Sequence, residues 1–265
     1  MTESLQSIEY HLKRVKTIWL FLDYDGTLDD FAPTPDEIRV NPEVVKLIQE
    51  LRATPRLFTA IISGRRLSHI EALIPVPGIL LAGTYGVEFR TPEGERVNRA
   101  DYATLRPHLE KLKSAWRELL DPHKEFFLED KDWALAIHAR LAQKEKAADI
   151  LSKARQIAAP AAGTGLFRLL GGDKFLELAP TAASKDQTVA YLMYRYPLPE
   201  GLPLYLGDDD KDEVAFATIQ AHEGIAGLVA KEPRRTKADF RIPSPQAARQ
   251  WIKRVLLESP TPPGS

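Results

Sequence analysis

The sequence predicts an α/β fold: a parallel sheet with crossover helices, interrupted by a separate α+β module. Two observations support this prediction. Short apolar runs alternate with amphipathic segments in the first and last thirds of the chain, the order in which helices connect parallel strands. The middle of the chain instead favours two helices, each followed by a hairpin, and this pattern is typical of an inserted module.

The N-terminal third supplies three expected strands and one helix. The apolar runs Ile18–Leu22, Leu57–Ile62 and Ile79–Ala82 are short enough for buried strands. Asn41-Pro42 is typical of a helix start, with an N-cap and a proline at the first helical position. Apolar residues then recur on one helix face at Val44, Val45, Ile48 and Leu51.

The middle and the C-terminal third follow different patterns. In the middle, we expect two helices, over Thr104–Leu120 and Gln143–Ala158. Each is followed by an expected hairpin. The first pairs Glu125–Leu128 with Trp133–Ala139, and the second pairs Leu166–Leu170 with Lys174–Leu178. Alternation then resumes, with helices over 184–195 and 211–222, strands at Leu204–Leu206 and Ile225–Ala230, and a last helix from Ser244-Pro245. The predicted divisions are therefore a core at 1–100 and 183–257, a module at 101–182, and a disordered tail at 258–265.

Composition limits the possible functions. The 265 residues are 44% hydrophobic and 28% charged, which suits a globular protein with a sizeable core. The absence of cysteine excludes disulfides, cysteine nucleophiles and thiolate metal sites. A formal net charge of −1 argues against nucleic acid as a partner. No apolar run approaches the ~20 residues of a membrane span and no signal peptide is evident, so we expect a cytoplasmic protein with no membrane partner.

The strongest chemical motif is Phe21-Leu-Asp-Tyr-Asp-Gly-Thr-Leu28, at the end of the first strand. Ligands of open α/β sheets bind beyond the carboxyl ends of the strands. An Asp-Gly turn would account for part of the motif. It does not account for both Asp23 and Asp25, because carboxylates crowded together repel each other unless a cation neutralises them.

A second acidic motif, Gly207-Asp-Asp-Asp-Lys-Asp-Glu213, also follows a short strand and precedes a helix. Acidic residues favour helix N-termini, but this run has more of them than capping requires. Two acidic strand ends in one parallel sheet can converge on one hard cation. Mg²⁺ suits such a site because it prefers carboxylates, water and phosphate oxygens.

Two further positions could bind an anion. Ile61-Ile-Ser-Gly-Arg65 places Ser63, with Gly64 and Arg65 behind it, where a strand ends and a helix is expected, although Ser63 could simply be an N-cap. Lys185 stands at another expected helix start, where a cation is unfavourable unless an anion is near; a solvated lysine is the alternative.

Together these residues predict phosphoryl transfer, which requires a nucleophile, an acid/base, a cation and donors to the phosphoryl oxygens. Asp23 could attack phosphorus to form an aspartyl-phosphate, and Asp25 could protonate the leaving alcohol and then activate water. Asp208 could share Mg²⁺ with Asp23. Ser63 and Lys185 could hold the phosphoryl oxygens.

These motifs resemble the four motifs of the haloacid dehalogenase superfamily and, more narrowly, the trehalose-6-phosphate phosphatase family. Leu22-Asp-Tyr-Asp-Gly-Thr-Leu28 is similar to the opening of that family, and the acidic motif through Phe216 matches its last one. The resemblance spans roughly residues 18–230. Three further stretches carry it: Gly83-Thr-Tyr-Gly-Val-Glu88, Glu129-Asp-Lys131 with His138-Ala-Arg140, and Glu177-Leu-Ala-Pro180 before Ser184-Lys185.

The resemblance implies a Rossmann-like core, with helices on both faces of its sheet and a small cap inserted after the second motif. It assigns Asp23 as nucleophile and metal ligand, and Asp25 as acid/base with its backbone carbonyl on Mg²⁺. It makes Asp208 a metal ligand and Asp209 and Asp212 supporting residues. Ser63 and Lys185, with neighbouring Gly64 and Arg65, would contact the substrate at its phosphate. The residues implied to face the sugar are Glu129, Lys131, His138, Arg140 and Glu177.

The chain departs from the family pattern at positions other than the predicted core catalytic and metal-binding residues. Tyr85 replaces a common histidine, and Asp173, Ala179 and Asp186 replace a lysine, an arginine and a glycine. Lys211 replaces a threonine before the last Asp-Glu pair. Because several of these positions lie in or near the cap, they affect the expected sugar more than the expected chemistry.

The leading prediction is therefore a Mg²⁺-dependent phosphatase that converts trehalose 6-phosphate to trehalose and phosphate. A glucosylglycerol- or sucrose-phosphate phosphatase keeps the chemistry and changes the substrate. A non-catalytic regulatory partner of a glycosyltransferase is a third reading, against which the intact pair Asp23 and Asp25 argues. A sugar-phosphate synthase is the functional partner we expect.

Overall fold

The computed structural model describes residues 4–31 and 39–258, and the chain divides into two compact units. Unit 1 combines residues 1–97 with 184–265, and unit 2 comprises residues 98–183. Of the tail predicted at 258–265, residues 259–265 lie outside the described part of the chain.

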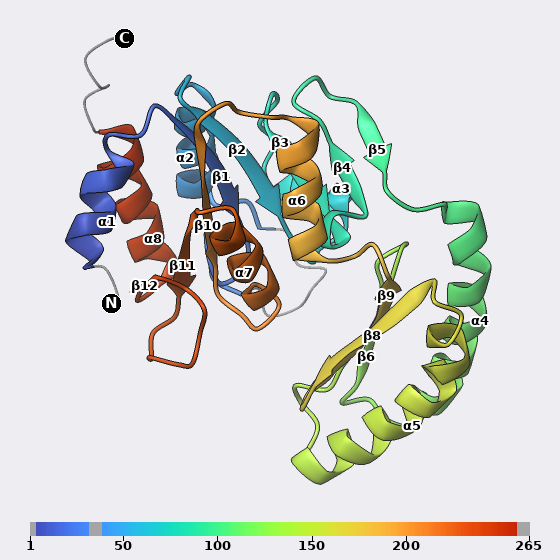
Figure 1. Ribbon diagram of the computed structural model, residues 1–265. Helices are drawn as coiled ribbons and strands as arrows, with labels where there is room; N and C mark the ends of the chain where they lie inside the picture. Colours follow the sequence, from blue (N-terminus) through green and yellow to red (C-terminus); the bar gives the residue numbers. More distant parts are fainter. Residues whose placement is uncertain (1–3, 32–38, 259–265) are drawn as a thin grey trace. The chain divides into compact units, whose positions relative to one another are not determined.

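Unit 1 is built on a mainly parallel sheet with strand order β12-β11-β10-β1-β2-β3-β4-β5 (Figure 1). All described pairings from β12 through β3 are parallel, and β4 pairs antiparallel with β3. The predicted parallel sheet is therefore confirmed. The strands are β1 (Thr17–Leu22), β2 (Leu57–Ile62), β3 (Leu80–Gly83), β4 (Glu88–Arg90), β5 (Arg96–Asn98), β10 (Gly201–Gly207), β11 (Ile225–Val229) and β12 (Phe240–Ile242).

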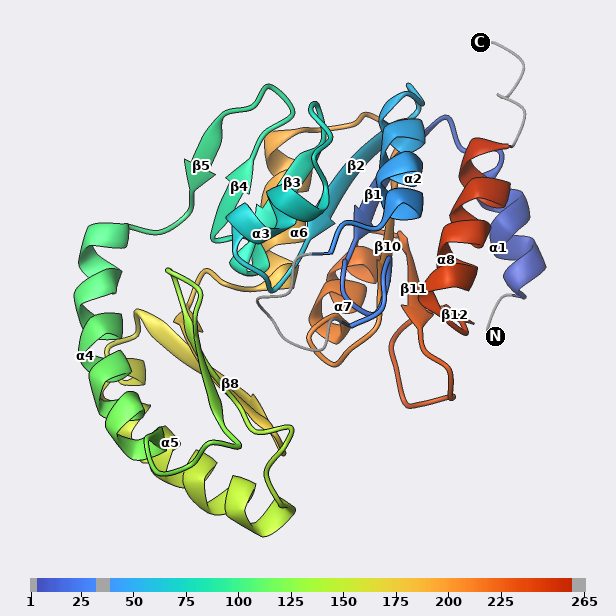
Figure 2. The ribbon, with the colours of Figure 1, turned by 180° about the vertical axis from the view of Figure 1, so that it is seen from behind.

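Helices cover both faces of this sheet because its central strands are apolar on both sides (Figure 2). Along β1, Ile18, Leu20 and Leu22 belong to one buried cluster, and Trp19 and Phe21 belong to the other. The first cluster includes residues of α1 (Leu5–Leu12), α2 (Pro42–Arg52), α3 (Leu67–Leu73) and α8 (Pro245–Ile252), and the second includes residues of α6 (Lys185–Arg195) and α7 (Glu213–Ala221).

Unit 2 is an antiparallel sheet with strand order β6-β7-β9-β8, together with two 19-residue helices. Its strands are β6 (Phe127–Asp130), β7 (Leu135–His138), β8 (Phe167–Gly172) and β9 (Phe175–Pro180), and its helices are α4 (Tyr102–Leu120) and α5 (Lys144–Ala162). The two helices are joined by a hydrogen bond from the buried indole of Trp116 to the Ala154 carbonyl at 3.0 Å. The two predicted hairpins thus form one sheet through the β7–β9 pairing.

Several element boundaries differ from the sequence predictions. The first strand of the predicted module begins at Phe127 and extends to Asp130, rather than spanning 125–128. The helix after β2 begins at Leu67 with Arg66 at its N-cap position, so Ser63 is not an N-cap. Sequence periodicity also missed the short elements α1, β4, β5 and β12, which are too brief to show a repeat.

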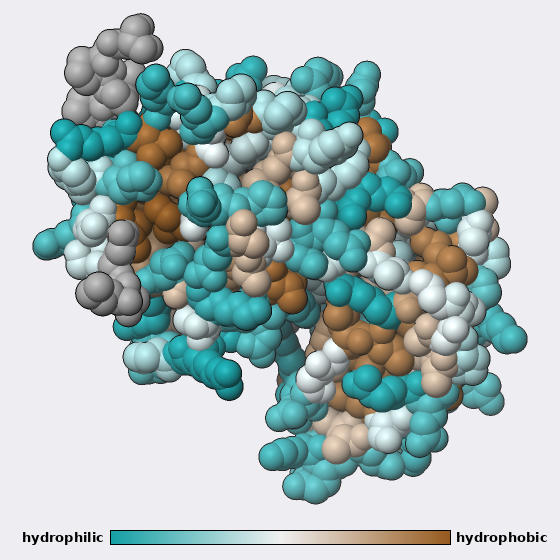
Figure 3. Space-filling model, in the orientation of Figure 1, coloured by the Kyte–Doolittle hydropathy of each residue, from teal (hydrophilic) through white to brown (hydrophobic). Residues whose placement is uncertain are grey.

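In the described residues, no helix is long and apolar enough to cross a membrane. Hydrophilic residues occupy most of the face shown in Figure 3, and hydrophobic residues form smaller groups between them.

Candidate active site

Three adjacent strands bring the predicted core motifs to one edge of the unit 1 sheet. Asp23 directly follows β1, Ser63 follows β2, and Asp208 follows β10. Because β10 and β2 flank β1 and run parallel to it, their carboxyl ends lie together at that edge. Hydrogen bonds fix two of these residues there, from the Asp23 N–H to the Leu206 carbonyl at 3.0 Å and from the Ser63 N–H to the Ala82 carbonyl at 2.9 Å.

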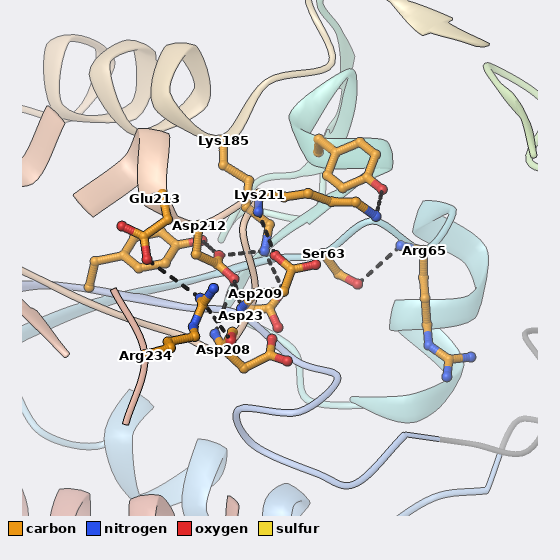
Figure 4. A network of polar contacts seen from close by, with 12 residues as sticks. Asp23, Ser63, Arg65, Lys185, Asp208, Asp209, Lys211, Asp212, Glu213 and Arg234 are labelled. Atoms are coloured by element: carbon orange, nitrogen blue, oxygen red, sulfur yellow. Dashed lines mark hydrogen bonds and ion pairs between the residues drawn. The ribbon is translucent and has the colours of Figure 1, made fainter. Parts of the chain in front are cut away.

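Lys185, the first residue of α6, is buried between two carboxylates of this edge (Figure 4). Its Nζ donates to Asp23 Oδ1 at 2.7 Å and to Asp212 Oδ1 at 2.5 Å. The position is unfavourable for a cation at a helix N-terminus, and the two carboxylates compensate for it. Burial opposes the charged form of Lys185, but Asp212 and Asp23 raise its pKa well above the ordinary lysine value.

The acidic cluster comprises Asp23, Asp208, Asp209 and Asp212. One carboxylate oxygen each from Asp23, Asp208 and Asp212 lies within 4.8 Å of the others. Asp212 is fully buried and also accepts hydrogen bonds from the Tyr205 hydroxyl at 2.7 Å and from the Asp208 and Asp209 N–H groups at 3.1 and 3.2 Å. Asp212 therefore contributes negative charge and also holds the loop between β10 and α7 (residues 208–212, the acidic loop) in place.

The acidic cluster has four carboxylates and one ammonium, that of Lys185. Burial and, after it, the charges of Asp23, Asp209 and Asp212 together raise the pKa of Asp208 to about 10. Burial likewise raises the pKa of Asp23 to about 7, although Lys185 acts against this rise. Closely grouped oxygen ligands with excess negative charge fit a hard divalent ion such as Mg²⁺.

A glycine allows the two acidic strand ends to approach each other. Gly26 has φ +81°, in the left-handed region, and a Cβ built on it would lie 2.2 Å from Asp208 Oδ2. The Asp-Gly step of the first motif is thus needed both for the turn after β1 and for the contact with the second motif.

Asp25 and Arg65 form a separate pair at the same edge. The Arg65 guanidinium donates from Nε and Nη2 to the two Asp25 oxygens at 2.8 and 2.7 Å. Ser63 Oγ accepts from the Arg65 N–H at 3.1 Å, so Ser63, Gly64 and Arg65 form a short turn before α3. The predicted acid/base thus contacts a residue that was predicted to bind substrate.

Four of the predicted sugar-facing residues form a mixed-charge cluster on the unit 2 sheet. Glu129 and Glu177 both pair in register with Ala136, and they lie on the same face as His138 because side chains alternate along a strand. Lys131 Nζ donates to Glu177 Oε2 at 3.1 Å and lies 3.9 Å from Glu129 Oε2, which also contacts His138 Nε2 at 2.8 Å. Arg140 lies two residues beyond β7 on an exposed turn.

Sequence reasoning missed several polar contacts of unit 1. Tyr205 was assigned to an apolar strand, yet a tyrosine in a buried strand needs a partner for its hydroxyl, and that requirement was an available signal. Arg234 donates to the Asp208 carbonyl at 3.2 Å and lies 3.4 Å from Glu213 Oε1. Nothing in the local sequence around Arg234 indicates these contacts.

Comparison with known protein sequences relates this chain to trehalose-phosphate phosphatases. The family described as trehalose-phosphatase matches residues 21–246. The trehalose-phosphate phosphatase of Mycobacterium tuberculosis is 30% identical over 251 residues, which cover 91% of this chain and 62% of that protein. The probable trehalose-phosphate phosphatase of Sinorhizobium fredii is 30% identical over 242 residues, which cover 90% of this chain and 87% of that protein.

The fold is also similar to that of solved structures. The C-terminal domain of Candida albicans trehalose-6-phosphate phosphatase superposes with a TM-score of 0.82 at 19% identity, covering 96% of this chain and 98% of that one. At 19% sequence identity, this structural similarity shows that the two chains share a fold. The chain spans less than two thirds of the length of the mycobacterial relative.

Proposed function

The chain belongs to the trehalose-phosphatase family, and from this premise we propose that it hydrolyses a sugar phosphate monoester, with trehalose 6-phosphate as the substrate and trehalose and phosphate as the products. The observation that carries the proposal is the contact of Lys185 with both Asp23 and Asp212, beside Asp208. In the proposal, this arrangement would supply a nucleophile, a buried cation and oxygen ligands for a divalent ion at one sheet edge.

In the proposed first step, an Asp23 oxygen attacks phosphorus and the ester P–O bond breaks. The leaving sugar oxygen takes a proton from Asp25. In the second step, Asp25 accepts a proton from water, whose oxygen attacks the aspartyl-phosphate and releases phosphate and Asp23. Asp25 must leave its ion pair with Arg65 before it can act as the acid.

The remaining core residues would bind and orient the phosphoryl group. Mg²⁺ held by Asp23, the Asp25 carbonyl and Asp208, with Asp209 in support, would neutralise negative charge and polarise a phosphoryl oxygen. Ser63 and Lys185 would donate to the other oxygens, with Gly64 and Arg65 close by. Asp212 would keep Lys185 and the acidic loop in place.

We propose that the mixed-charge cluster of unit 2 recognises the sugar hydroxyls. Carboxylates and an ammonium held by one another, such as Glu129, Lys131 and Glu177, provide acceptors and donors in fixed positions. His138 and the exposed Arg140 complete the proposed set. Ala179 lies on β9 and Asp173 in the β8–β9 turn, and their departures from the family pattern keep another glycosyl phosphate as the alternative substrate.

The proposal is tested by phosphate release from a panel of sugar phosphates, with Mg²⁺ or with a chelator. We expect the highest kcat/KM with trehalose 6-phosphate, no turnover with the chelator, and no turnover by Asp23→Asn. Faster turnover of glucosylglycerol phosphate or sucrose phosphate would overturn the substrate assignment. No release from any sugar phosphate would overturn the enzymatic function and favour a regulatory role.

A synthase that makes the sugar phosphate stays a predicted partner, and a cytoplasmic location stays a prediction.

A further inference from the structure

Two residues that depart from the family pattern, Tyr85 and Lys211, contact each other in unit 1. Tyr85 lies in the turn η1 (Thr84–Gly86) after β3, and Lys211 lies in the acidic loop between β10 and α7. Lys211 Nζ donates to the Tyr85 hydroxyl at 2.9 Å (Figure 4) and lies 5.3 Å from the centroid of its ring. The contact joins the acidic loop to a turn that has no acidic residue.

The backbone of Tyr85 is fixed by the elements that carry the other core motifs. Its N–H donates to the Ser63 carbonyl at 2.8 Å, and its carbonyl accepts from the Thr188 hydroxyl of α6 at 2.7 Å. Its φ of 56° is in the left-handed region, which a bulky residue adopts only when its surroundings impose it. The backbone that carries the buried Tyr85 ring is therefore held in place.

The Tyr85 ring lies beside the turn formed by Ser63 and Gly64. A Cβ built on Gly64 would lie 2.7 Å from Tyr85 Cε1 and 2.8 Å from its hydroxyl oxygen, so the ring can lie there only because residue 64 is glycine. The ammonium that donates to this hydroxyl is consequently close to the turn proposed to bind phosphate. The backbone of Lys211 is held within the acidic loop, because its N–H donates to Asp209 Oδ1 at 2.8 Å.

The charge balance of the site gives a role to a positive charge beside Ser63, which is to reduce the repulsion between the carboxylates and the phosphate. In the acidic cluster, Lys185 is the ammonium that bonds to Asp23 and Asp212, and the cluster has four carboxylates. Even with a divalent ion, these groups leave an excess negative charge, into which a phosphate dianion must enter. The charge of Arg65 is matched by its pairing with Asp25. A further positive charge beside Ser63 would reduce this repulsion.

We propose that Lys211 is a phosphate-binding residue of this enzyme and that Tyr85 is the positioning residue that holds its ammonium at the Ser63–Gly64 turn. The inference rests on the proposed phosphatase function and extends it to a second lysine. It predicts opposite effects of the Lys211 charge on the two ions of the site. That charge attracts phosphate and repels Mg²⁺.

The test compares five variants of the full chain: Lys211→Met, Lys211→Arg, Tyr85→Phe, the double variant Tyr85→Phe with Lys211→Met, and the control Lys46→Met, whose side chain on α2 is 70% exposed. Titration calorimetry measures the Kd of Mg²⁺ alone and the Kd of inorganic phosphate at saturating Mg²⁺. Steady-state kinetics give KM and kcat for the sugar phosphate.

For Lys211→Met we expect the phosphate Kd and the substrate KM to rise about tenfold, a kcat within about threefold of wild type, and a tighter Mg²⁺ Kd. Lys211→Arg should restore the phosphate affinity. Tyr85→Phe should raise the phosphate Kd about threefold in the wild-type background and have no effect in the Lys211→Met background, because the hydroxyl acts through the ammonium. Lys46→Met should match wild type.

An unchanged phosphate Kd in Lys211→Met would overturn the inference, and so would a variant that binds both phosphate and Mg²⁺ more weakly, since only a damaged loop weakens both. Calorimetry requires no turnover. Absence of hydrolysis by the wild-type protein would thus refute the proposed function, whereas a failure of the Lys211 assignment would appear in an active enzyme.

Discussion

The two units each contain a buried group of charged side chains, and the two groups differ in how their charges are balanced. In unit 1, the acidic cluster gathers at the ends of parallel strands and has more carboxylates than its buried ammonium can neutralise. In unit 2, the mixed-charge cluster lies across neighbouring antiparallel strands, where Lys131 sits between Glu129 and Glu177. The first group has four carboxylates for one ammonium, whereas the second has two carboxylates for one ammonium, with the His138 imidazole on one of them.

This difference is consistent with the different roles proposed for the two clusters, catalysis in unit 1 and sugar recognition in unit 2. An excess of negative charge holds a metal and tunes a nucleophile, but it is costly without the metal. A cluster in which carboxylates and an ammonium bond to one another presents donors and acceptors in fixed positions to a ligand. The predictions below test whether the two clusters are independent in this sense.

The largest expected effect comes from comparing Asp23→Asn with Glu129→Gln. Asp23→Asn should lower kcat at least about a thousandfold on every phosphate monoester, because it removes the nucleophile. Glu129→Gln should lower kcat/KM for the sugar phosphate about tenfold and leave hydrolysis of a small aryl phosphate unchanged. Steady-state kinetics with both substrates measures the two effects. Equal losses on both substrates in Glu129→Gln would contradict the separation.

The next effect concerns stability. Lys131→Met removes the ammonium that donates to the fully buried Glu177, and breaking a buried ion pair on one side costs about 3 kcal/mol. Urea unfolding of the full chain should show this loss, and Mg²⁺ should not reverse it. Lys153→Met is the matched control, since the Lys153 side chain on α5 is 54% exposed. A loss below about 1 kcal/mol in Lys131→Met would show that this cluster is not held by its lysine.

A third effect separates the clusters by pH. The pKa values of Asp23 and Asp208, about 7 and about 10, lie above the ordinary aspartate value. The metal-free folded state therefore binds these protons more tightly than the unfolded chain, and its stability should fall as pH rises from about 4 toward these values. Protons and Mg²⁺ compete for the same oxygens, so the Mg²⁺ affinity should tighten at least about tenfold between pH 6 and pH 8. Calorimetry that finds a pH-independent Kd would contradict this.

The smallest effect has the opposite dependence on pH and lies in unit 2. Burial alone would raise the pKa of Asp130, but hydrogen bonds from Arg106 and Lys113 hold it well below the ordinary value. This stabilisation is present above the ordinary pKa of aspartate and is lost as pH falls below it. Asp130→Asn should cost about 1 kcal/mol at pH 7 in urea unfolding, and the difference should shrink below about pH 4. A difference that persists at pH 3 would exclude the ionic origin.

Much of the fold was predictable because the signals were local. Five consecutive buried residues in β1 and the capping of α2 by Asn41 are visible in the sequence, and both elements were predicted with nearly correct bounds. The four-stranded sheet of unit 2 was not predicted as one sheet, since the β7–β9 pairing joins strands separated by the whole of α5. Long-range pairing of this kind has no local pattern.

Placement of the site residues was predictable to the extent that strand ends share an edge. Asp23, Ser63 and Asp208 follow from that rule alone. The rule says nothing of side-chain direction, so the pairing of Asp25 with Arg65 could not be anticipated, nor could the contact between Tyr85 and Lys211. In the sequence these last two residues appear only as two unrelated departures from a pattern.

The discontinuity of unit 1 has a consequence for how the chain folds. Asp23 and Lys185 are 162 residues apart in sequence, and β1 at the centre of the sheet must pair with β10, which follows the whole of unit 2. The contact order of unit 1 is therefore high and that of unit 2, a contiguous segment, is lower. During synthesis from the N-terminus, unit 2 emerges complete before β10 is made. We therefore expect unit 2 to become ordered first and the sheet edge that carries Asp23, Ser63 and Asp208 to be assembled last.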